Sequence, residues 1–321
     1  MSSVAAEKIT RYLSEARSDS HETRERALRA LTSLTKVSPQ NRTLIVQTEG
    51  AIPALLSLSK SPNSPMTQVL SLAILFNLSL NHDLKQRLAD MKTICHLNSI
   101  IASPDTSKES SRLASSLICS LAMLDKNKAK FGVAGTIQLL IDTISGPMWP
   151  AATHHNLSSL AELVHFHGNS TLAVRSGAVP ALIQVVKERT EGEDLAGTSL
   201  AVLCLLARFD EGLSALRKSK GIVECMVEVL KGRCMLSKEG ATEILIRLFD
   251  ESEGCARDAL RMPEFAGVLA DLSVSGSAKA REKASVLMKK MMELADHLDT
   301  PPYHADHGIS PSLFGPLGLE Y

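Results

Sequence analysis

The stretch IQLLIDTI, residues 137–144, carries the pattern that decides the fold. Apolar residues stand at its first, fourth, fifth and eighth positions (Ile137, Leu140, Ile141 and Ile144), a spacing that places these four on one face of an α-helix. Copies of this pattern open, 42 to 44 residues apart, at Ile52, Ile94, Ile137, Val179, Val223 and Phe265. The first two copies each depart from it once, at Ser59 and Asn98. A fixed period of this length is typical of a solenoid of stacked helical units.

Each copy predicts three helices. In the copy at residues 40–81, a short helix over 41–46 precedes a second helix over 52–59 and a longer third helix over 67–80. Gly50 can end the first helix in the left-handed conformation, and the breaker-rich turn 61–65 separates the second helix from the third. Further first helices are predicted at 83–89, 127–131, 169–174, 211–216 and 256–260. Further third helices are predicted at 108–124, 153–165, 195–208, 238–249 and 278–295, and a lone third helix at 22–37 precedes the first full copy.

The period divides the chain into three parts. Residues 1–20 form an N-terminal segment ahead of the predicted helices, and residues 21–295 form the solenoid. Residues 296–321 lose the period and contain four prolines, so we expect a disordered tail.

The composition limits the possible partners and the compartment. Lys+Arg and Asp+Glu both number 35, so the net charge is zero and a general affinity for nucleic acid or for an anionic membrane is not expected. No apolar run approaches the roughly 18 residues of a membrane span, and the N-terminus lacks the apolar core of a signal peptide. The six cysteines form no Cys-x-x-Cys pair and suit free thiols in a reducing compartment. We therefore expect a cytoplasmic or nuclear protein.

Enzyme and cofactor signatures are absent from the sequence. It contains no Gly-x-Gly-x-x-Gly, no phosphate-binding Gly-x-x-x-x-Gly-Lys and no Gly-x-Ser-x-Gly motif. His154, His155, His165 and His167 cluster along the chain, but no carboxylate or cysteine completes a metal-ligand set. We expect no catalytic residue, no metal, no cofactor and no small-molecule substrate.

Several segments resemble a known repeat family. NRTLIVQTEGAIPAL (41–55) and RSGAVPALI (175–183) resemble the armadillo consensus, and AILFNLS (73–79) resembles its third helix. ASVLMKKM (284–291) is similar to the armadillo region of plant U-box ubiquitin ligases. The resemblance covers about residues 20–295. It implies an all-α, right-handed superhelical solenoid with about six full repeats and partial ends.

The plant ligases carry a U-box ahead of their repeats, and this module docks the ubiquitin-charged enzyme. Here only some 20 residues precede the predicted helices. The resemblance therefore implies the substrate-reading part of such a ligase without its ubiquitin-transfer module.

In armadillo proteins the third helices line a concave groove and often present an asparagine to the backbone of a bound peptide. Aligning the third helices maps Asn77 onto Ser33, Ser120, Glu162, Leu205, Arg247 and Lys290. Because only one of these positions is asparagine, we expect a mixed, sequence-specific groove rather than a regular ladder. The candidate peptide-groove residues are Asn77, Ser120, Glu162, Arg247 and Lys290, and the alternative that these side chains are only solvated stays open.

Basic residues gather towards the end of the predicted groove, where the last third helix adds Lys279, Arg281, Lys283 and Lys289. An acidic partner segment could bind there, and an ordinary solvated helix face is the alternative.

The predicted function is a non-enzymatic scaffold that binds a protein or peptide partner along the concave groove. The alternative is a ubiquitin-pathway component, a relative of the U-box ligases that lacks the U-box. A nuclear import adaptor is disfavoured because the tryptophan that accompanies the groove asparagines in those proteins is missing; the single Trp149 lies in a turn. The sequence does not indicate the oligomeric state.

Overall fold

The computed structural model describes residues 2–60, 64–146, 150–188 and 195–299. Within these ranges the chain forms 20 helices and no strand. Trp149 and the predicted tail from residue 300 onward lie outside the described residues.

The helices repeat in the predicted order of first, second and third. The first helices are α3 (Pro39–Gln47), α6 (His82–Leu88), α9 (Asp125–Val133), α12 (His167–Arg175), α15 (Asp210–Lys218) and α18 (Glu253–Leu260). The second helices are α4 (Ala51–Leu58), α7 (Met91–Ala102), α10 (Thr136–Ser145), α13 (Ala178–Glu188), α16 (Ile222–Leu230) and α19 (Phe265–Ser275). The third helices are α2 (His21–Val37), α5 (Pro65–Ser79), α8 (Lys108–Ala122), α11 (Pro150–Leu163), α14 (Leu195–Leu206), α17 (Met235–Glu251) and α20 (Ala278–Asp299). The prediction of an all-helical solenoid with three helices per unit is confirmed.

The helical array extends further at both ends than the sequence analysis placed it. Helix α1 (Ser2–Glu15) occupies the segment that was predicted to precede the helices, so that prediction was wrong. Its buried residues Ile9, Leu13 and the adjoining Ala16 follow a helical spacing, and the helix packs on α2 and α3. At the other end, α20 continues past residue 295 to Asp299.

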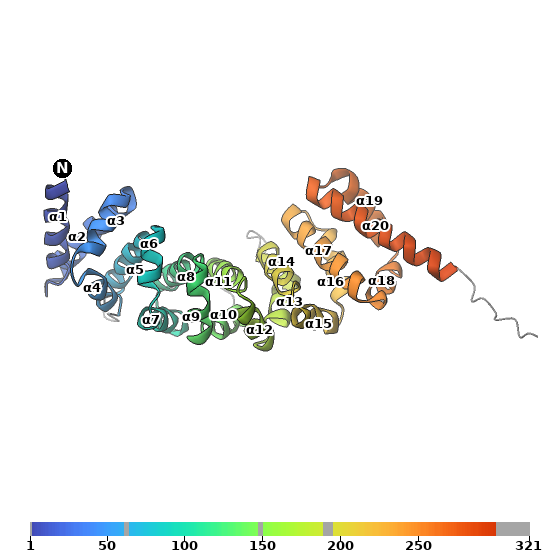
Figure 1. The fold of residues 1–321 in the computed structure, drawn as a ribbon, viewed down its shortest axis with the longest axis horizontal. Coiled ribbons are helices and arrows are strands. Elements are labelled where there is room, and N and C mark those ends of the chain that lie inside the picture. The colour runs from blue at the N-terminus through green and yellow to red at the C-terminus, as the bar shows by residue number, and fades with distance from the viewer. Residues whose placement is uncertain (1, 61–63, 147–149, 189–194, 300–321) are drawn as a thin grey trace, which may run out of the picture.

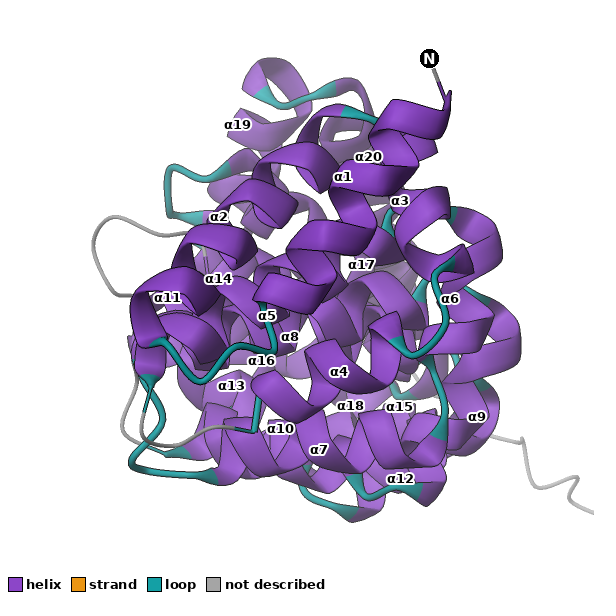
Figure 2. Cartoon of the chain, turned by 90° about the vertical axis from the view of Figure 1, so that its left-hand side faces the viewer, coloured by secondary structure: helices purple, strands orange, loops and turns teal. Residues whose placement is uncertain are grey.

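Third helices of consecutive repeats contact one another from α2 through α5, α8, α11, α14 and α17 to α20, and we call this the third-helix layer. Figure 1 shows the array as a bent rod, with α14 and α17 towards the inside of the bend and α12 and α15 towards the outside. Figure 2 looks along the rod from its N-terminal end, where α1 lies over the first repeat.

The repeated apolar pattern fills the core. Ile137, Leu140, Ile141 and Ile144 of α10 are all 3% exposed or less, and they belong to one hydrophobic core that continues from α1 to α20. Burying a side chain of this size stabilises the fold by about 1.5–3 kcal/mol. Since each repeat covers the apolar face of its neighbour, the rod is held together by contacts between adjacent units.

The two departures from the apolar pattern form hydrogen bonds between repeats. The buried Ser59 hydroxyl at the end of α4 lies 2.8 Å from His96 Nε2 on α7. The Asn98 amide of α7 donates to the Ala134 carbonyl over 3.0 Å, and its oxygen accepts from the Thr136 hydroxyl over 3.0 Å. Both polar residues therefore connect the second helix of one repeat to the next repeat.

Glycine sets the corner between first and second helices in four repeats. Gly50, Gly135, Gly177 and Gly221 have φ values of 71°, 75°, 83° and 72°, in the left-handed region that other L-residues adopt at a cost. This confirms the left-handed conformation predicted for Gly50, and the same conformation recurs at the other three corners. Before α7, Asp90 caps the helix instead by accepting from the Thr93 amide over 2.9 Å.

Replacing Gly177 by alanine tests the conformational role of the corner. No atom lies within 4 Å of the position where a Cβ would stand, so the cost comes from the positive φ alone. We expect a destabilisation of about 1–2 kcal/mol, measured as a lower thermal midpoint. Gly267→Ala is the matched control, because Gly267 lies inside α19 with equal space and no positive φ. The control should raise stability by about 0.5–1 kcal/mol, and a loss of equal size in both variants would contradict the assignment.

The burial of His96 predicts a pH dependence of stability. Burial, followed by the charge of Lys60, lowers the pKa of His96 to about 4. An unfolded histidine has a pKa of about 6.5, so acid between about pH 6.5 and 4 protonates the unfolded chain more than the folded one. Stability that is fully present above pH 6.5 is therefore lost as the pH falls towards 4.

In His96→Gln, the fall in thermal midpoint between pH 7 and pH 5 should be smaller than in the wild type. His82→Gln makes the same change at an exposed site on α6 and is the control. Parallel midpoint curves for wild type and His96→Gln would contradict this account.

Candidate protein-binding groove

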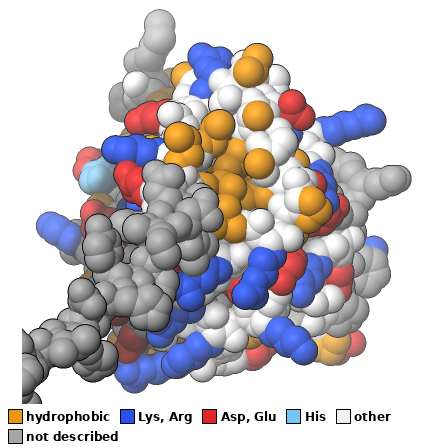
Figure 3. Space-filling view, turned by 90° about the vertical axis from the view of Figure 1, so that its right-hand side faces the viewer, with side chains coloured by type: hydrophobic (Ala, Val, Ile, Leu, Met, Phe, Trp, Pro, Cys, Tyr) orange, Lys and Arg blue, Asp and Glu red, His pale blue; other side chains and the backbone are white. Residues whose placement is uncertain are grey.

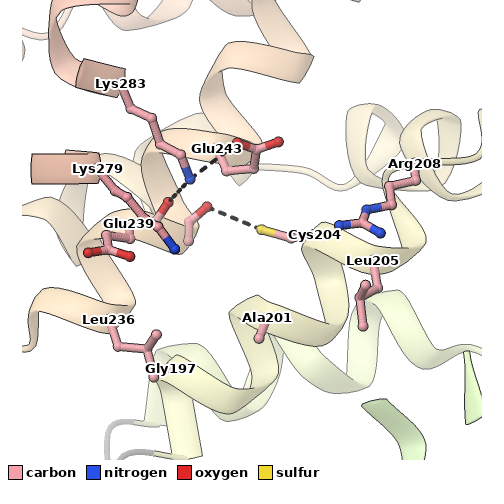
Figure 4. A pocket seen from close by; sticks show the side chains of 11 residues that line it. Gly197, Ala201, Cys204, Leu205, Arg208, Leu236, Glu239, Glu243, Lys279 and Lys283 are labelled. Carbon is pink, nitrogen blue, oxygen red and sulfur yellow. Dashed lines mark hydrogen bonds and ion pairs between the residues drawn. The ribbon is translucent and has the colours of Figure 1, made fainter. Parts of the chain in front are cut away.

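The third-helix layer is hollowed between α14, α17 and α20. The hollow has a volume of about 440 Å³, and we call it the groove pocket. It is lined by Gly197, Ala201, Cys204, Leu205 and Arg208 from α14 and the residues that follow it, by Leu236, Glu239, Gly240 and Glu243 from α17, and by Lys279 and Lys283 from α20. Figure 4 shows these side chains around the pocket. The pocket thus spans the third helices of three successive repeats.

Small residues explain why the layer is hollow here. A Cβ at Gly240 would lie 2.8 Å from the Cβ of Leu200, so the glycine lets α17 approach α14 closely. Gly197 and Ala201 add almost no side-chain volume on the α14 side. The Cys204 thiol donates to the Gly240 carbonyl over 3.5 Å. Burial, and then the charge of Glu243, raise the pKa of Cys204 to about 12, so the thiol is neutral at pH 7.

An ion-pair network lies along one wall of the pocket. The Glu243 carboxylate is 2.9 Å from Arg247 on the same helix and 3.2 Å from Lys283 on α20. Burial acts to raise the pKa of Glu243, but hydrogen bonds and charges from Lys283 and Arg247 outweigh it, and the pKa is lowered. Lys283 also donates to the Glu239 carbonyl over 3.1 Å. This network connects α20 to α17.

Two of the predicted groove residues are engaged between third helices. The Asn77 amide of α5 donates to the Thr35 hydroxyl of α2 over 3.0 Å. Ser120 of α8 is 6% exposed, and its hydroxyl lies 2.8 Å from that of Ser79 on α5. Both side chains therefore have a structural role, and their part in peptide binding stays a prediction.

The other three predicted residues are partly exposed and lie on separate helices. Glu162 is partly exposed on α11. Arg247 pairs with Glu243 beside the pocket, and Lys290 of α20 forms an ion pair with Asp250. The five candidates are thus distributed along the third-helix layer rather than gathered in one pocket.

Lys279 and Lys283 were among the basic residues predicted from the sequence at the end of the groove, whereas Cys204 and Arg208 were not predicted. The feature of the sequence that could have predicted the pocket is the presence of small residues within two third helices, namely Gly197, Ala201 and Gly240.

Asparagines do recur in the array, but on the first helices. Asn41, Asn127 and Asn169 are each the third residue of α3, α9 and α12. Each side-chain amide donates over 3.0 Å to a carbonyl at or near the end of the preceding third helix. Asn127 and Asn169 also donate to carbonyls in the first helix one repeat earlier. This recurrent asparagine stabilises repeat stacking rather than facing the groove.

Other surfaces of the described part of the chain are less specific. A depression of about 710 Å³ beside α7 includes Lys60, Lys92 and His96. Among the described residues, no group of three His, Cys, Asp or Glu side chains is placed to hold a metal ion, and no helix combines the length and hydropathy that crossing a membrane requires.

The C-terminal end of the array presents an apolar surface. Val274 of α19 and Val286 and Met292 of α20 are exposed. Figure 3 shows apolar side chains gathered on the face at this end, with lysine and arginine side chains below them.

A stack of three-helix units with a period near 42 residues, whose third helices form one hollowed layer, defines an armadillo repeat protein. Within this class, the sequence matches the plant U-box protein ARM repeat region over residues 7–299. The chain belongs to that family.

Known proteins with similar sequences carry U-box names. The chain is 30% identical over 138 residues to U-box domain-containing protein 1 of Medicago truncatula, covering 43% of this chain and 19% of the relative. It is 29% identical over 223 residues to U-box domain-containing protein 8 of Arabidopsis thaliana, covering 67% of this chain and 55% of the relative. The matched region therefore spans about a fifth and about half of these two relatives.

A designed armadillo repeat protein solved in complex with the peptide (KR)4 has a similar fold. Its TM-score is 0.66 at 14% sequence identity, and the match covers 74% of this chain and 98% of the designed one.

Proposed function

We propose that this chain is a non-enzymatic protein–protein interaction scaffold that binds an extended segment of a partner polypeptide along the third-helix layer. The observation that carries the proposal is the groove pocket, which is continuous over α14, α17 and α20. A segment lying across three stacked helices would contact three repeats at once. Because the stacked repeats are packed before binding, little conformational entropy would be lost by the scaffold.

Peptide binding by a protein of the same fold supports this proposal, since the designed armadillo protein is in complex with the peptide (KR)4. The composition of the groove differs along its length in this chain. The candidate side chains Asn77 of α5 and Ser120 of α8 are neutral and hydrogen-bonded to neighbouring third helices, whereas the groove side chains of α17 and α20 include the charged Glu243, Lys283 and Lys290. We therefore place the main contact with a partner at the C-terminal half of the layer.

A second candidate function is a role in the ubiquitin pathway, in substrate recognition or in its regulation. It is favoured by the family match and by the U-box names of the relatives. A cytoplasmic or nuclear location fits both candidates, and it is part of the proposal.

Partner capture with charge-matched variants tests the groove. The groove variant combines Glu162→Ala, Arg247→Ala and Lys290→Ala, and it removes one acidic and two basic side chains from the third-helix layer. The control variant combines Glu224→Ala, Arg217→Ala and Lys218→Ala, exposed residues of α15 and α16 that do not line the groove pocket. Partners that use the groove should be recovered at a level lower by about tenfold or more with the groove variant.

Recovery is quantified by mass spectrometry after capture on the immobilised chain, and the control should match the wild type. Equal recovery of every partner with wild type and groove variant would refute the groove as the binding surface. Thermal midpoints of the three proteins show whether any loss reflects unfolding.

The non-enzymatic part of the proposal has its own test. Purified chain mixed with ubiquitin, activating enzyme, conjugating enzyme and ATP should form no ubiquitin conjugates, because the described residues form only the helical array. The measurement is an immunoblot for ubiquitin, with a complete U-box ligase as positive control. Conjugates that depend on this chain alone would show that it is an enzyme.

A further inference from the structure

Two cations of the groove pocket have no partner among the described residues. Arg208, just after α14, and Lys279, in the first turn of α20, are both exposed and line the pocket. Neither side chain forms a hydrogen bond or ion pair with another described residue. Figure 4 shows the two side chains reaching towards the pocket from opposite sides.

The other charged groups of the pocket already have partners. Glu243 is paired with Lys283 and Arg247, and Glu239 accepts a hydrogen bond from the Ser277 hydroxyl. Cys204 adds no negative charge because its thiol is protonated. The pocket lining contains three cations and two anions, and Arg247 beside it adds a fourth cation. The site therefore has an excess of positive charge, and Arg208 and Lys279 are its two cations without an ion pair to another described residue.

The remaining lining is apolar or small. Leu236 is 53% exposed at the α17 wall, and Leu205 and Ala201 line the α14 side. A partner side chain without charge could pack here, next to a charged one that reaches Arg208 or Lys279. In an extended peptide the side chains at positions i and i+2 point to the same face, so a charged and an uncharged side chain two positions apart could both face the pocket.

We propose that the groove pocket binds an acidic segment of a partner protein in extended conformation, with Arg208 and Lys279 as the carboxylate-binding residues. This inference rests on the proposed function and names the chemistry of the partner. A carboxylate held between an arginine and a lysine gains charge-assisted hydrogen bonds. The same two cations would increase the association rate with acidic partners and make binding sensitive to salt.

Fluorescence anisotropy with labelled peptides tests the preference for acidic segments. The probes are (Glu-Thr)4, (Gln-Thr)4 and (Lys-Thr)4, in which the β-branched threonine favours an extended backbone. The full chain should bind (Glu-Thr)4 about tenfold or more tightly than (Gln-Thr)4 at low salt, and the difference should shrink as salt is raised.

A double variant, Arg208→Ala with Lys279→Ala, should lower the affinity for (Glu-Thr)4 by about tenfold and leave that for (Gln-Thr)4 nearly unchanged. The matched control is Arg217→Ala with Lys218→Ala, which removes the same charge from exposed positions of α15 in the adjoining repeat. It should change the affinity by less than about twofold. Arg208→Lys with Lys279→Arg keeps both charges and should retain most of the binding.

Three outcomes would overturn the inference: equal losses in the two alanine double variants, tighter binding of (Gln-Thr)4 or (Lys-Thr)4 than of (Glu-Thr)4, or no binding of (Glu-Thr)4 at millimolar concentration. These outcomes are distinguishable from failure of the proposed function. A neutral or basic peptide that loses affinity in the Glu162, Arg247 and Lys290 variant would keep the groove and reject only its acidic preference. Equal partner capture by that variant would reject the groove itself.

Discussion

Packing between the third helices of successive repeats is the interaction on which the rest of this structure depends. Each repeat leaves part of its apolar surface uncovered, and its neighbours bury that surface. Several polar side chains in this contact are paired across it, as in Asn77 with Thr35 or Ser79 with Ser120. Such pairing avoids the cost of about 1–3 kcal/mol that an unpartnered buried polar group carries. The position of every groove residue follows from this stacking.

The residues that fill the core and those that line the groove pocket are largely different sets, although they share helices. On α17, Leu245 and Leu248 are fully buried, whereas Leu236 and Glu239 line the pocket. A change at a pocket position can therefore alter recognition at little cost to stability. Close packing limits this freedom at Gly240, where even one added carbon would meet Leu200.

Much of the fold could be predicted because the repeated spacing of apolar residues indicates which helix faces are buried. The pattern from Ile137 to Ile144 fixed a helix and its buried face, and the glycine corners fixed where first helices end. Helix α1 was missed because a single amphipathic helix has no second copy with which to align it. The groove was harder: Asn77 and Ser120 occupy the expected helix face, but whether such a side chain faces a partner or its neighbouring helix depends on the spacing between repeats. Arg208 and Lys279 are far apart in sequence, and only the stacking brings them to one pocket.

The connections between third helices change in kind along the rod, and this has a mechanical consequence. From α2 to α11, short hydroxyl and amide side chains join neighbours, as Ser115 and Asn156 do over 2.6 Å. Between α17 and α20 the links run instead through Lys283 and Lys290, whose long stems allow displacement before the contact is lost. The rod should therefore be stiffer in its N-terminal half, and thermal bending should be largest near its C-terminal end. At that end the groove pocket could widen or narrow to fit bulkier or slimmer polypeptides without disturbing the N-terminal repeats.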